Sequence, residues 1–305
     1  MPAESRHKTS PAVGVVIVNH NLNDSLRETL QSFRKVDYPD LQIVVSDNAS
    51  SDGSQAMVRT EFPEVHLLAH ETEQGYARAA SLGMAALADK SKYIFSTTND
   101  VMVDPQIIHV LVDYAESHSD AGVLGTKIYF FDRPTTLWHA GGRIHPLHGH
   151  SYHLGWERKD GPVYSKVREC DFVTGCGFLL RTDVLKKIGY FKEDLVFYSE
   201  DAELCYRFRE AGYKAMYIPE AKMWHKTGTT LAKNRPVQLR YSTRNGLYLL
   251  QRHRVGWHPF TLWSHLLIVS PLKMLIFAAM LKGKNSVGIW KGIQDWRAGK
   301  YGWIK

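Results

Sequence analysis

The stretch VGVVIVNHNLNDSLRETLQSFRKVDYPDLQIVVSDN, residues 13–48, places an amphipathic segment between two apolar runs. The first run, residues 13–21, is almost continuously apolar and β-branched, which is typical of a strand buried on both faces. The middle segment carries apolar residues at helical spacing behind Asn23 and Asp24, either of which can cap a helix. Residues 41–48 return to strand character, so the stretch predicts a β–α–β unit with parallel strands.

The same alternation continues toward residue 130. The later elements are predicted strands at 65–69, 93–100 and 121–130, and predicted helices at 57–62, 76–89 and 105–118. This order predicts an α/β fold with a mostly parallel sheet flanked by helices. Ligands of such folds bind at the carboxyl ends of the strands.

Polar residues follow three of the predicted strands at their carboxyl ends. They are Asn19, the segment from Asp47 to Asp52, and the pair Asn99 and Asp100. We expect the sheet to gather them on one rim. No GxGxxG motif follows the first strand, so any bound nucleotide needs another group to neutralise its phosphates.

The composition is that of an ordinary globular protein. The chain has 305 residues, 44% of them hydrophobic and 23% charged, which suits one large domain with or without an appendage. Residues 1–12 are polar with no apolar segment behind them, so we expect a flexible N-terminus, no secretory signal and a cytoplasmic location. Cys170, Cys176 and Cys205 form no CxxC pair, which argues against a disulfide framework and a zinc ribbon.

Residues 131–169 show no clear period, which is typical of a functional insertion or lid. They contain HPLHGHSYH, residues 145–153, with four histidines but without the spacing of a known zinc motif. We therefore favour a surface loop that faces a second substrate over a structural metal site. Trp138 and His139, in the same stretch, are candidates for the acceptor side of a site.

Residues 173–230 hold the densest group of reactive side chains. Glu200, Asp201 and Glu203 crowd a predicted helix start, and His225 follows a short strand-like run. Acids at a helix N-terminus also complement its dipole, and for Glu203 we favour that structural role.

Seven motifs, in this order, resemble the inverting family-2 glycosyltransferases of the GT-A fold, especially the bacterial branch of rhamnosyl- and galactofuranosyltransferase-like enzymes. The resemblance covers residues 13–246. The motifs are VVIVNHN (15–21), VVSDNASSDGS (44–54), QGYARAAS (74–81), TTNDVMVD (97–104), VTGCGFLLR (173–181), FYSEDAELCYR (197–207) and MWH (223–225).

The resemblance implies a binding site for a nucleotide-diphosphate sugar. The backbone near Asn19 and the side chain of Asp47 are implied to bind the base and ribose, with Asn48 and Asp52 shaping the loop. The implied site extends to Asn99 in the metal motif and to a segment against the nucleotide, which holds Gly75, Tyr76 and Arg78.

The resemblance also implies a divalent cation and a general base. Asp100 is implied to hold Mg²⁺ or Mn²⁺ against the donor diphosphate, with His225 as a second ligand. Asp201 matches the base that deprotonates the acceptor hydroxyl, and Glu200 orients Asp201 or bonds the acceptor. Gly175 and Cys176 are implied to line the acceptor side.

Two departures from the family pattern weaken the metal prediction. The metal motif reads Thr98, Asn99, Asp100, so only its last acid is present, and the ETEQG segment (71–75) replaces the usual Asn-Leu-Gly. A mechanism that depends little on metal, and a packing role for His225, therefore stay open. So does a catalytically inactive scaffold that binds a glycan or a nucleotide sugar, although the presence of both Asp100 and Asp201 argues against it.

A nucleotidyltransferase is a further alternative from another class of enzyme. It needs a Gly-rich, Lys-containing loop near the first strand, and VNHNLND, residues 18–24, is not one.

Residues 231–305 differ in charge from the rest of the chain. They carry 13 Lys and Arg side chains against one acid, Asp295, whereas the preceding residues carry 25 basic and 30 acidic ones. Basic residues interleaved with tryptophan suit an anionic membrane surface, and no recognition motif supports nucleic acid as the partner. Five of the eight tryptophans lie here: Trp257, Trp263, Trp290, Trp296 and Trp303.

The apolar stretch at 258–284 is interrupted by His265, Pro271 and Lys273, so we expect amphipathic helices in the interface rather than a spanning helix of about 20 residues. The alternative is that these helices pack on the preceding domain with solvated charges.

The sequence thus predicts a GT-A domain at 13–245, with a nucleotide-binding half (13–130) and an acceptor half (131–245). Residues 246–305 are predicted to be an amphipathic, membrane-associating helical extension. The predicted function is inverting transfer of a sugar, with dTDP-rhamnose or a UDP-sugar as donor, to a bacterial surface glycan or lipid-linked acceptor at the inner face of the cell membrane. The sequence predicts no oligomeric state.

Overall fold

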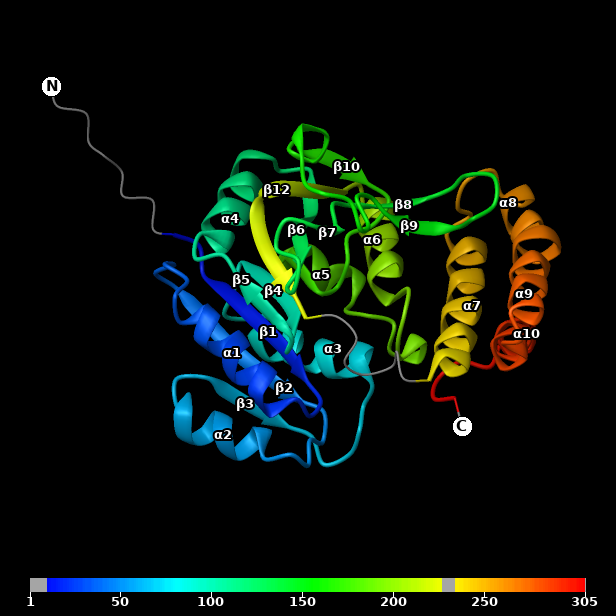
Figure 1. Ribbon diagram of the computed structural model, residues 1–305. Coiled ribbons are helices and arrows are strands. Elements are labelled where there is room, and N and C mark those ends of the chain that lie inside the picture. The colour runs from blue at the N-terminus through cyan, green and yellow to red at the C-terminus, as the bar shows by residue number, and fades with distance from the viewer. Residues whose placement is uncertain (1–9, 227–233, 305) are drawn as a thin grey trace, which may run out of the picture.

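The computed structural model describes residues 10–226 and 234–304 (Figure 1). Its strands are β1 (Val13–Asn19), β2 (Leu41–Asp47), β3 (His66–Ala69), β4 (Tyr93–Thr98), β5 (Val101–Val103), β6 (Ala121–Phe130), β7 (Leu137–His139), β8 (Gly142–Ile144), β9 (Ser151–His153), β10 (Arg168–Cys170), β11 (Gly177–Arg181) and β12 (Lys214–His225). Its helices are α1 (Asn23–Phe33), α2 (Ser54–Glu61), α3 (Tyr76–Leu87), α4 (Ile107–Ser117), α5 (Thr182–Ile188), α6 (Glu200–Glu210), α7 (Arg235–Arg252), α8 (Phe260–Ser264), α9 (Ser270–Ala279) and α10 (Gly283–Arg297).

The main sheet runs in the order β10-β12-β6-β11-β4-β1-β2-β3, with β5 beside β12 and β7 beside β6. Strands β1 to β4 pair in parallel with one another, as do β6 and β12. The predicted α/β fold with a mostly parallel sheet is therefore confirmed. β8 and β9 form a separate hairpin.

Both faces of the sheet are covered because the central strands are apolar on both sides. In β1, Val13, Val15 and Ile17 pack against α1, α2 and α4, whereas Val16 and Val18 pack on the opposite side, which α3, α5 and α6 cover. Successive strand side chains point to opposite faces, so a continuous apolar run supplies two core layers.

One strand breaks the parallel pattern. β11 runs antiparallel between β4 and β6, with Gly177 beside Thr97 at the carboxyl end of β4. The chain between β6 and β11 contains no helical crossover of the βαβ kind, so it enters β11 at the end where β4 finishes. As a result, Gly175 and Cys176 arrive at the rim formed by the carboxyl ends of the parallel strands.

The C-terminal helices form a layer beside the sheet domain (Figure 1). α7 runs unbroken from Arg235 to Arg252 and so crosses the predicted domain boundary after residue 245. α10 packs closely on α7, and Arg240 of α7 pairs with Asp295 of α10 at 2.5 Å.

The segment Phe260–Ala279 is one continuous helix of 20 residues, formed by α8, a π-helical turn at His265–Val269, and α9. Its mean hydropathy is 1.6 over a window only 11% buried, so by length and composition it is able to cross a membrane. The sequence suggested an interrupted stretch. The structure differs because the π turn, in which the N–H of Ser270 bonds to the carbonyl of His265, carries the helix past Pro271.

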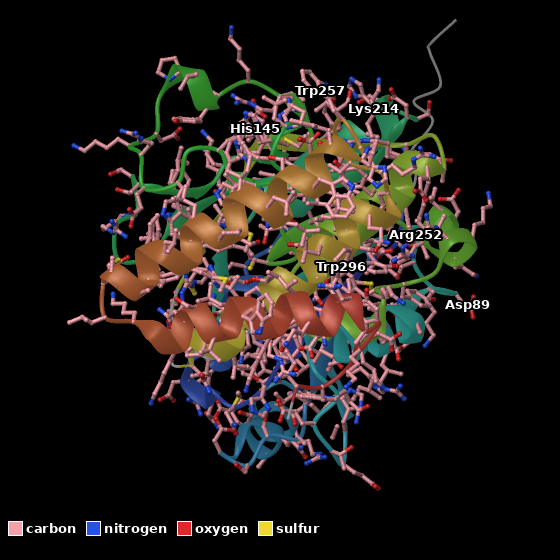
Figure 2. All side chains as sticks on the ribbon, turned by 90° about the vertical axis from the view of Figure 1, so that its right-hand side faces the viewer. Asp89, His145, Lys214, Arg252, Trp257 and Trp296 are labelled. Carbon is pink, nitrogen blue, oxygen red and sulfur yellow. The ribbon has the colours of Figure 1, made fainter. Side chains whose placement is uncertain are left out.

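Large apolar side chains are exposed on this helix and on α10, which cross the face seen in Figure 2. We call this surface the outer helical face. Its exposed members are Trp257, Phe260, Trp263, Leu267, Ile268, Leu272, Leu275, Ile276, Met280, Leu281, Val287 and Trp290.

The close packing of α10 on α7 gives the first prediction. A Cβ at Gly288 would lie 2.3 Å from the carbonyl oxygen of Pro236, a backbone atom that cannot rotate away. Gly288→Ala should therefore push the two helices apart and cost about 1–3 kcal/mol, which lowers the melting temperature by several degrees. Calorimetry of the full chain measures this.

The matched control is Gly283→Ala at the first residue of α10, where a Cβ meets nothing within 4 Å. This variant should melt within about 1 °C of the wild type or slightly above it, since alanine is the better helix former. Equal melting temperatures for the two variants would contradict the packing described.

Candidate functional site

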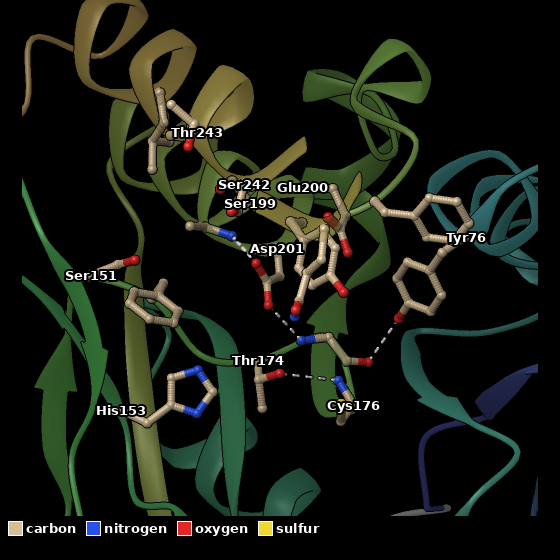
Figure 3. Close-up of a pocket in the computed structure, with 18 of the residues that line it drawn as sticks. Tyr76, Ser151, His153, Thr174, Cys176, Ser199, Glu200, Asp201, Ser242 and Thr243 are labelled. Carbon is tan, nitrogen blue, oxygen red and sulfur yellow. Dashed lines mark hydrogen bonds between the residues drawn. The ribbon is translucent and has the colours of Figure 1, made fainter. Parts of the chain in front are cut away.

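A cavity of about 650 Å³ lies at the carboxyl ends of the parallel strands. The ends of β1, β2 and β4 supply one wall, and the loop before β11 and the start of α6 supply the floor. The β8–β9 hairpin, α7 and the helix 260–279 close the remaining side. Segments from nearly the whole chain therefore meet here, and Figure 3 shows part of the lining.

Asp201 lies in the first turn of α6 and lines the cavity. Its carboxylate accepts hydrogen bonds from the backbone N–H of Gly175 at 3.0 Å and of Ala202 at 2.7 Å (Figure 3). Burial raises the pKa of Asp201, and these backbone donors oppose that rise because they stabilise the anion.

Glu200 also lines the cavity, and its Oε2 is buried without a hydrogen-bond partner among the described residues. Burial first, and the neighbouring Asp201 charge second, raise the pKa of Glu200 well above its ordinary value. Two adjacent carboxyls, one buried and one partly buried, cannot both ionise cheaply. Asp201, with two backbone donors, is the one placed to carry the negative charge, and Glu200 is the one placed to keep its proton.

Glu203 takes a structural role, as the sequence favoured. It is buried outside the cavity lining, and its carboxylate pairs with Arg207 at 2.9 Å.

The loop that delivers Asp201 is held in an unusual backbone conformation. Val196, Tyr198 and Ser199 have φ values of 63°, 67° and 66°. Such left-handed conformations are uncommon for residues other than glycine, and a β-branched valine adopts them at a particular cost. The loop therefore needs partners that hold it in place.

Two buried neighbours on α7 supply those partners. Asn245 donates to the carbonyls of Leu195, Phe197 and Tyr198 at 2.9, 2.7 and 2.9 Å. Arg244 donates to the carbonyl of Leu195 at 3.2 Å. We call this pair the Arg244–Asn245 clamp.

Arg244 also ties the end of the chain to this loop. Its guanidinium donates to the carbonyl of Gly302 at 2.9 Å, and the N–H of Gly302 donates to the carbonyl of Asp194 at 2.7 Å. Burial lowers the pKa of Arg244. The positive charge is stabilised here chiefly by carbonyl oxygens.

Asp100 and His225 meet on the strand rim. Oδ1 of Asp100 lies 3.2 Å from Nε2 of His225 and accepts the hydroxyl of Thr98 at 2.6 Å. Two neighbouring ligands of one divalent cation lie about 3 Å apart when each bond is about 2.1 Å. His225 Nδ1 is buried without a hydrogen-bond partner among the described residues. The pair fits two ligands of a Mg²⁺ or Mn²⁺ ion, whose other ligands would come from phosphate and water.

The residues predicted to read the nucleoside form a buried network behind the rim. Asn19 donates to Asp47 at 2.6 Å, and Asn99 donates to Asn19 at 2.5 Å. Asp47 also accepts from Ser50 and Gln55, at 3.0 and 2.7 Å, so its carboxylate is occupied within the loop. Asn19 and Asp47 do not line the cavity in the described residues, whereas Asn99 does.

The other residues predicted to bind the nucleotide also divide into those that line the cavity and those that do not. Asn48 and Tyr76 line the cavity. Asp52 caps the backbone N–H groups of Asn23 and Ser54, at 2.8 and 3.1 Å, at a distance from the cavity wall. The remaining two are Gly75, at φ 79° with no room for a Cβ beside Val196, and Arg78, paired with Glu193 at 2.9 Å on the surface.

The predicted acceptor residues are placed as follows. Gly175 and Cys176 line the cavity beside Asp201, and Gly175 accepts a hydrogen bond from the Tyr76 hydroxyl at 2.9 Å. Trp138 also lines it, with its ring 4.7 Å from that of His225. His139 is fully buried beneath the lining.

The His-rich stretch lies along the cavity, with Gly149, His150, Ser151 and His153 on its wall. Across residues 10–226 and 234–304, no group of three His, Cys, Asp or Glu side chains is placed to hold a metal ion.

Sequence reasoning missed the contribution of α7 and the helix 260–279. The Arg244–Asn245 clamp has no distinct mark in the sequence, because the same run, LRYSTRNGLYLL (239–250), also holds Arg240, Ser242 and Thr243. Arg235 and Lys273 reach the cavity through packing of the C-terminal helices, and no local motif marks them.

Comparison with known proteins agrees with this architecture. The sequence profile of the family described as Glycosyltransferase like family 2 matches residues 11–242. N-acetylglucosaminyl-diphospho-decaprenol L-rhamnosyltransferase of Mycobacterium tuberculosis is 24% identical over 289 residues, which cover 85% of this chain and 94% of the relative. Poly-beta-1,6-N-acetyl-D-glucosamine synthase of Staphylococcus epidermidis is 19% identical over 72% of this chain and 51% of its own.

Solved structures are similar in fold. The mannosyltransferase PcManGT of Pyrobaculum calidifontis, in complex with GDP-Man and Mn²⁺, has a TM-score of 0.63 at 14% identity and covers 96% of this chain and 89% of its own. GalNAc-T7 with UDP, GalNAc and Mn²⁺ has a TM-score of 0.64 at 13% identity, covering 95% and 57%.

The clamp gives the second prediction. Asn245→Ala removes the amide that donates to three carbonyls of the strained loop, one in a buried and two in partly buried hydrogen bonds, and should cost about 1–3 kcal/mol of unfolding free energy. Relaxation of the loop should also lower turnover by more than the loss of folded protein explains. Chemical denaturation and the turnover of the folded fraction measure the two effects.

The control is Arg252→Ala, on the exposed side of the same helix, where the pair with Glu210 spans 3.6 Å at the surface. This change should cost less than about 1 kcal/mol and leave turnover intact. A variant at Asn245 that matched this control in both measurements would show that the loop holds its shape without the clamp.

Proposed function

The chain belongs to glycosyltransferase-like family 2 and takes its sugar from a nucleotide-sugar donor, and we propose that it works as an inverting enzyme with Asp201 as its general base. The observation that carries this proposal is the position of Asp201. Its carboxylate is partly buried, lines the cavity and is favoured over Glu200 as the charged member of the pair.

Asp201 would take the proton from an acceptor hydroxyl as that oxygen attacks the anomeric carbon of the donor sugar. The bond from this carbon to the nucleoside diphosphate breaks on the opposite face, so one displacement inverts the centre. A raised pKa suits a general base, because the base must bind the proton as it leaves the hydroxyl. Glu200, which would stay neutral, would be able to donate a hydrogen bond and would add no negative charge beside Asp201.

Asp100 and His225 would hold a Mg²⁺ or Mn²⁺ ion on the donor side of the cavity. The ion would neutralise the diphosphate and so assist its departure. Support for this assignment comes from the 3.2 Å spacing of the two ligand atoms. The structures of PcManGT and GalNAc-T7, which are similar in fold, were solved with Mn²⁺.

The nucleoside is proposed to lie against the loop 47–55. His20 and Asn48 line the cavity beside that loop, and the Nδ1 of His20 lies 2.8 Å from the carbonyl oxygen of Asn48. In this proposal Asp47 fixes the loop through its three internal hydrogen bonds. The donor we propose is dTDP-rhamnose, with a UDP-sugar as the alternative, and the acceptor is a glycan of the bacterial surface or its lipid-linked precursor.

The enzyme is proposed to sit on the cytoplasmic face of the cell membrane through its outer helical face. Exposed tryptophans and aliphatic side chains share this surface with lysines such as Lys282 and Lys284. Apolar side chains beside cations suit the boundary between acyl chains and anionic headgroups. The cavity is closed by the other side of the same helix, so a lipid-linked acceptor would reach it directly.

The base assignment gives the third prediction. Asp201→Asn should lower turnover by about 10²–10⁴-fold, because the amide cannot accept the proton. Donor binding should survive, so UDP or dTDP with Mn²⁺ should raise the melting temperature of the variant as it does that of the wild type. Removing Mn²⁺ with a chelator should diminish that shift in both proteins.

The control for the same chemical change is Asp89→Asn, an exposed residue whose carboxylate pairs with Lys186 at 2.6 Å. This variant should retain wild-type turnover. Undiminished turnover of the Asp201 variant would refute the general-base assignment.

The membrane placement gives the fourth prediction. The full chain should co-float with vesicles that contain anionic phosphatidylglycerol at physiological salt. Ile268→Glu combined with Leu272→Glu should reduce the bound fraction severalfold, since each change places a charge on the inserted surface. Val163→Glu, an exposed apolar residue outside that surface, should bind like the wild type. Failure of the wild type to bind such vesicles would exclude this placement.

A further inference from the structure

Basic side chains gather on the wall of the cavity formed by α7, the helix 260–279 and the loop before β9. Lys273, His150 and Arg235 all line the cavity. The Nζ of Lys273 lies 3.4 Å from Nδ1 of His150. When Nδ1 accepts from the ammonium group, the proton of the neutral ring is on Nε2, which becomes a second donor.

This wall is held together by contacts that join its segments. The Nδ1 of His265 lies 2.8 Å from the carbonyl oxygen of His148, so the loop is fastened to the helix that carries Lys273. The rings of His145 and His148 stack at 3.8 Å in the same loop. The basic groups therefore have fixed positions relative to one another.

The wall has cations without carboxylate partners. Among the side chains of residues 10–226 and 234–304, no Asp or Glu comes within 4.0 Å of the charged groups of Lys273 or Arg235. Arg235 instead donates to the side-chain oxygen of Gln238. Burial lowers the pKa of Lys273, and the nearby charge of Arg235 lowers it further. A partly buried cation is costly without an opposite charge, so this wall is suited to an anion that the chain does not supply.

The basic wall is separate from the proposed donor diphosphate. The ring of Trp138 lies 4.7 Å from that of His225 and 5.0 Å from that of His153, which places His153 near the metal side. Lys273 and Arg235 come from the helix 260–279 and α7, whereas Asp100 and His225 come from the strand rim. The cavity therefore offers phosphate groups one wall at Asp100 and His225 and another at Lys273.

The helix that carries Lys273 has an apolar groove beside it. This groove, of about 870 Å³, lies between the helix 260–279 and α10, with Trp296 on its border (Figure 2). Pro271, Met274 and Leu275 line it, so residues on either side of Lys273 face an apolar space while Lys273 faces the cavity. A ligand with an anionic head and a long apolar chain matches this arrangement.

We propose that Lys273, with His150 and Arg235, binds the diphosphate of a prenyl-diphosphate-linked acceptor, an assignment that rests on the proposed transferase function. The diphosphate would lie against Lys273, the sugar attached to it would extend toward Asp201, and the prenyl chain would leave along the helix 260–279 to the apolar groove. Lys273 is a binding residue that fixes which acceptors reach the base.

The test measures binding of a soluble probe, farnesyl diphosphate, to the full chain by calorimetry. The titration is run without and then with saturating UDP and Mn²⁺, which occupy the donor side. Lys273→Gln should weaken farnesyl diphosphate by about tenfold or more, since a charge-assisted hydrogen bond is lost. Lys284→Gln, an equal loss of charge at an exposed position of α10, should change affinity less than twofold.

Three outcomes would overturn the assignment. Equal losses of affinity for farnesyl diphosphate in the two lysine variants would mean that Lys273 attracts the ligand only through long-range charge. Displacement of farnesyl diphosphate by UDP and Mn²⁺ would place it in the donor site. Lys273→Gln could also lose as much affinity for phosphatidylglycerol vesicles as for farnesyl diphosphate. That result would identify the anion as a lipid headgroup.

The acceptor kinetics separate this assignment from the transferase function itself. With a prenyl-linked acceptor, Lys273→Gln should raise the KM of the acceptor about tenfold and leave the KM of the donor unchanged. Normal acceptor KM in an active variant would refute the subsite alone. Absence of nucleotide binding in the wild type would refute the transferase proposal. The affinity for farnesyl diphosphate would still show whether Lys273 binds a diphosphate.

Discussion

The position of Asp201 depends on how the Arg244–Asn245 clamp holds the loop before α6. Three residues of that loop adopt left-handed backbone conformations, and none of them is a glycine. This conformation costs free energy, and contacts within the loop do not offset that cost. It persists because α7 donates hydrogen bonds to the loop carbonyls at 2.7–3.2 Å. Asp201 follows directly from this loop, and its position is therefore set by a helix more than forty residues later in the chain.

Charge is organised around the cavity in a way that the net charge of the chain does not reveal. The neighbouring carboxyls of Glu200 and Asp201 supply negative charge to the cavity, and they differ in their hydrogen bonding. The strand rim offers ligand atoms for a cation, and the wall at Lys273 offers cations. Each of these groups lies in a partly dry cavity, where electrostatic interactions are stronger than in water.

The fold was largely predictable from sequence, and the site only in part. Alternating apolar runs such as residues 13–21 and 41–48 specified the parallel strands, because buried strands and amphipathic helices have different periods. The rim residues followed from that order, as Asn99 and Asp100 show. The occupied carboxylate of Asp47 depends on hydrogen bonds from Asn19 and Gln55, and Lys273 reaches the cavity only through helix packing. Such long-range contacts leave no periodic trace in a single sequence.

The contacts of Gly302 mean that the loop before α6 gains its last partners late in synthesis. Arg244 and Asp194 both bond to the backbone of Gly302, and the ring of Trp303 lies 5.8 Å from that of Phe197. The last strand of the sheet, β12, ends at His225, more than seventy residues before Gly302. All strands of the sheet are therefore synthesised before the loop that precedes Asp201 gains its partners at residues 302 and 303. The C-terminal helices are made in the interval between these two events.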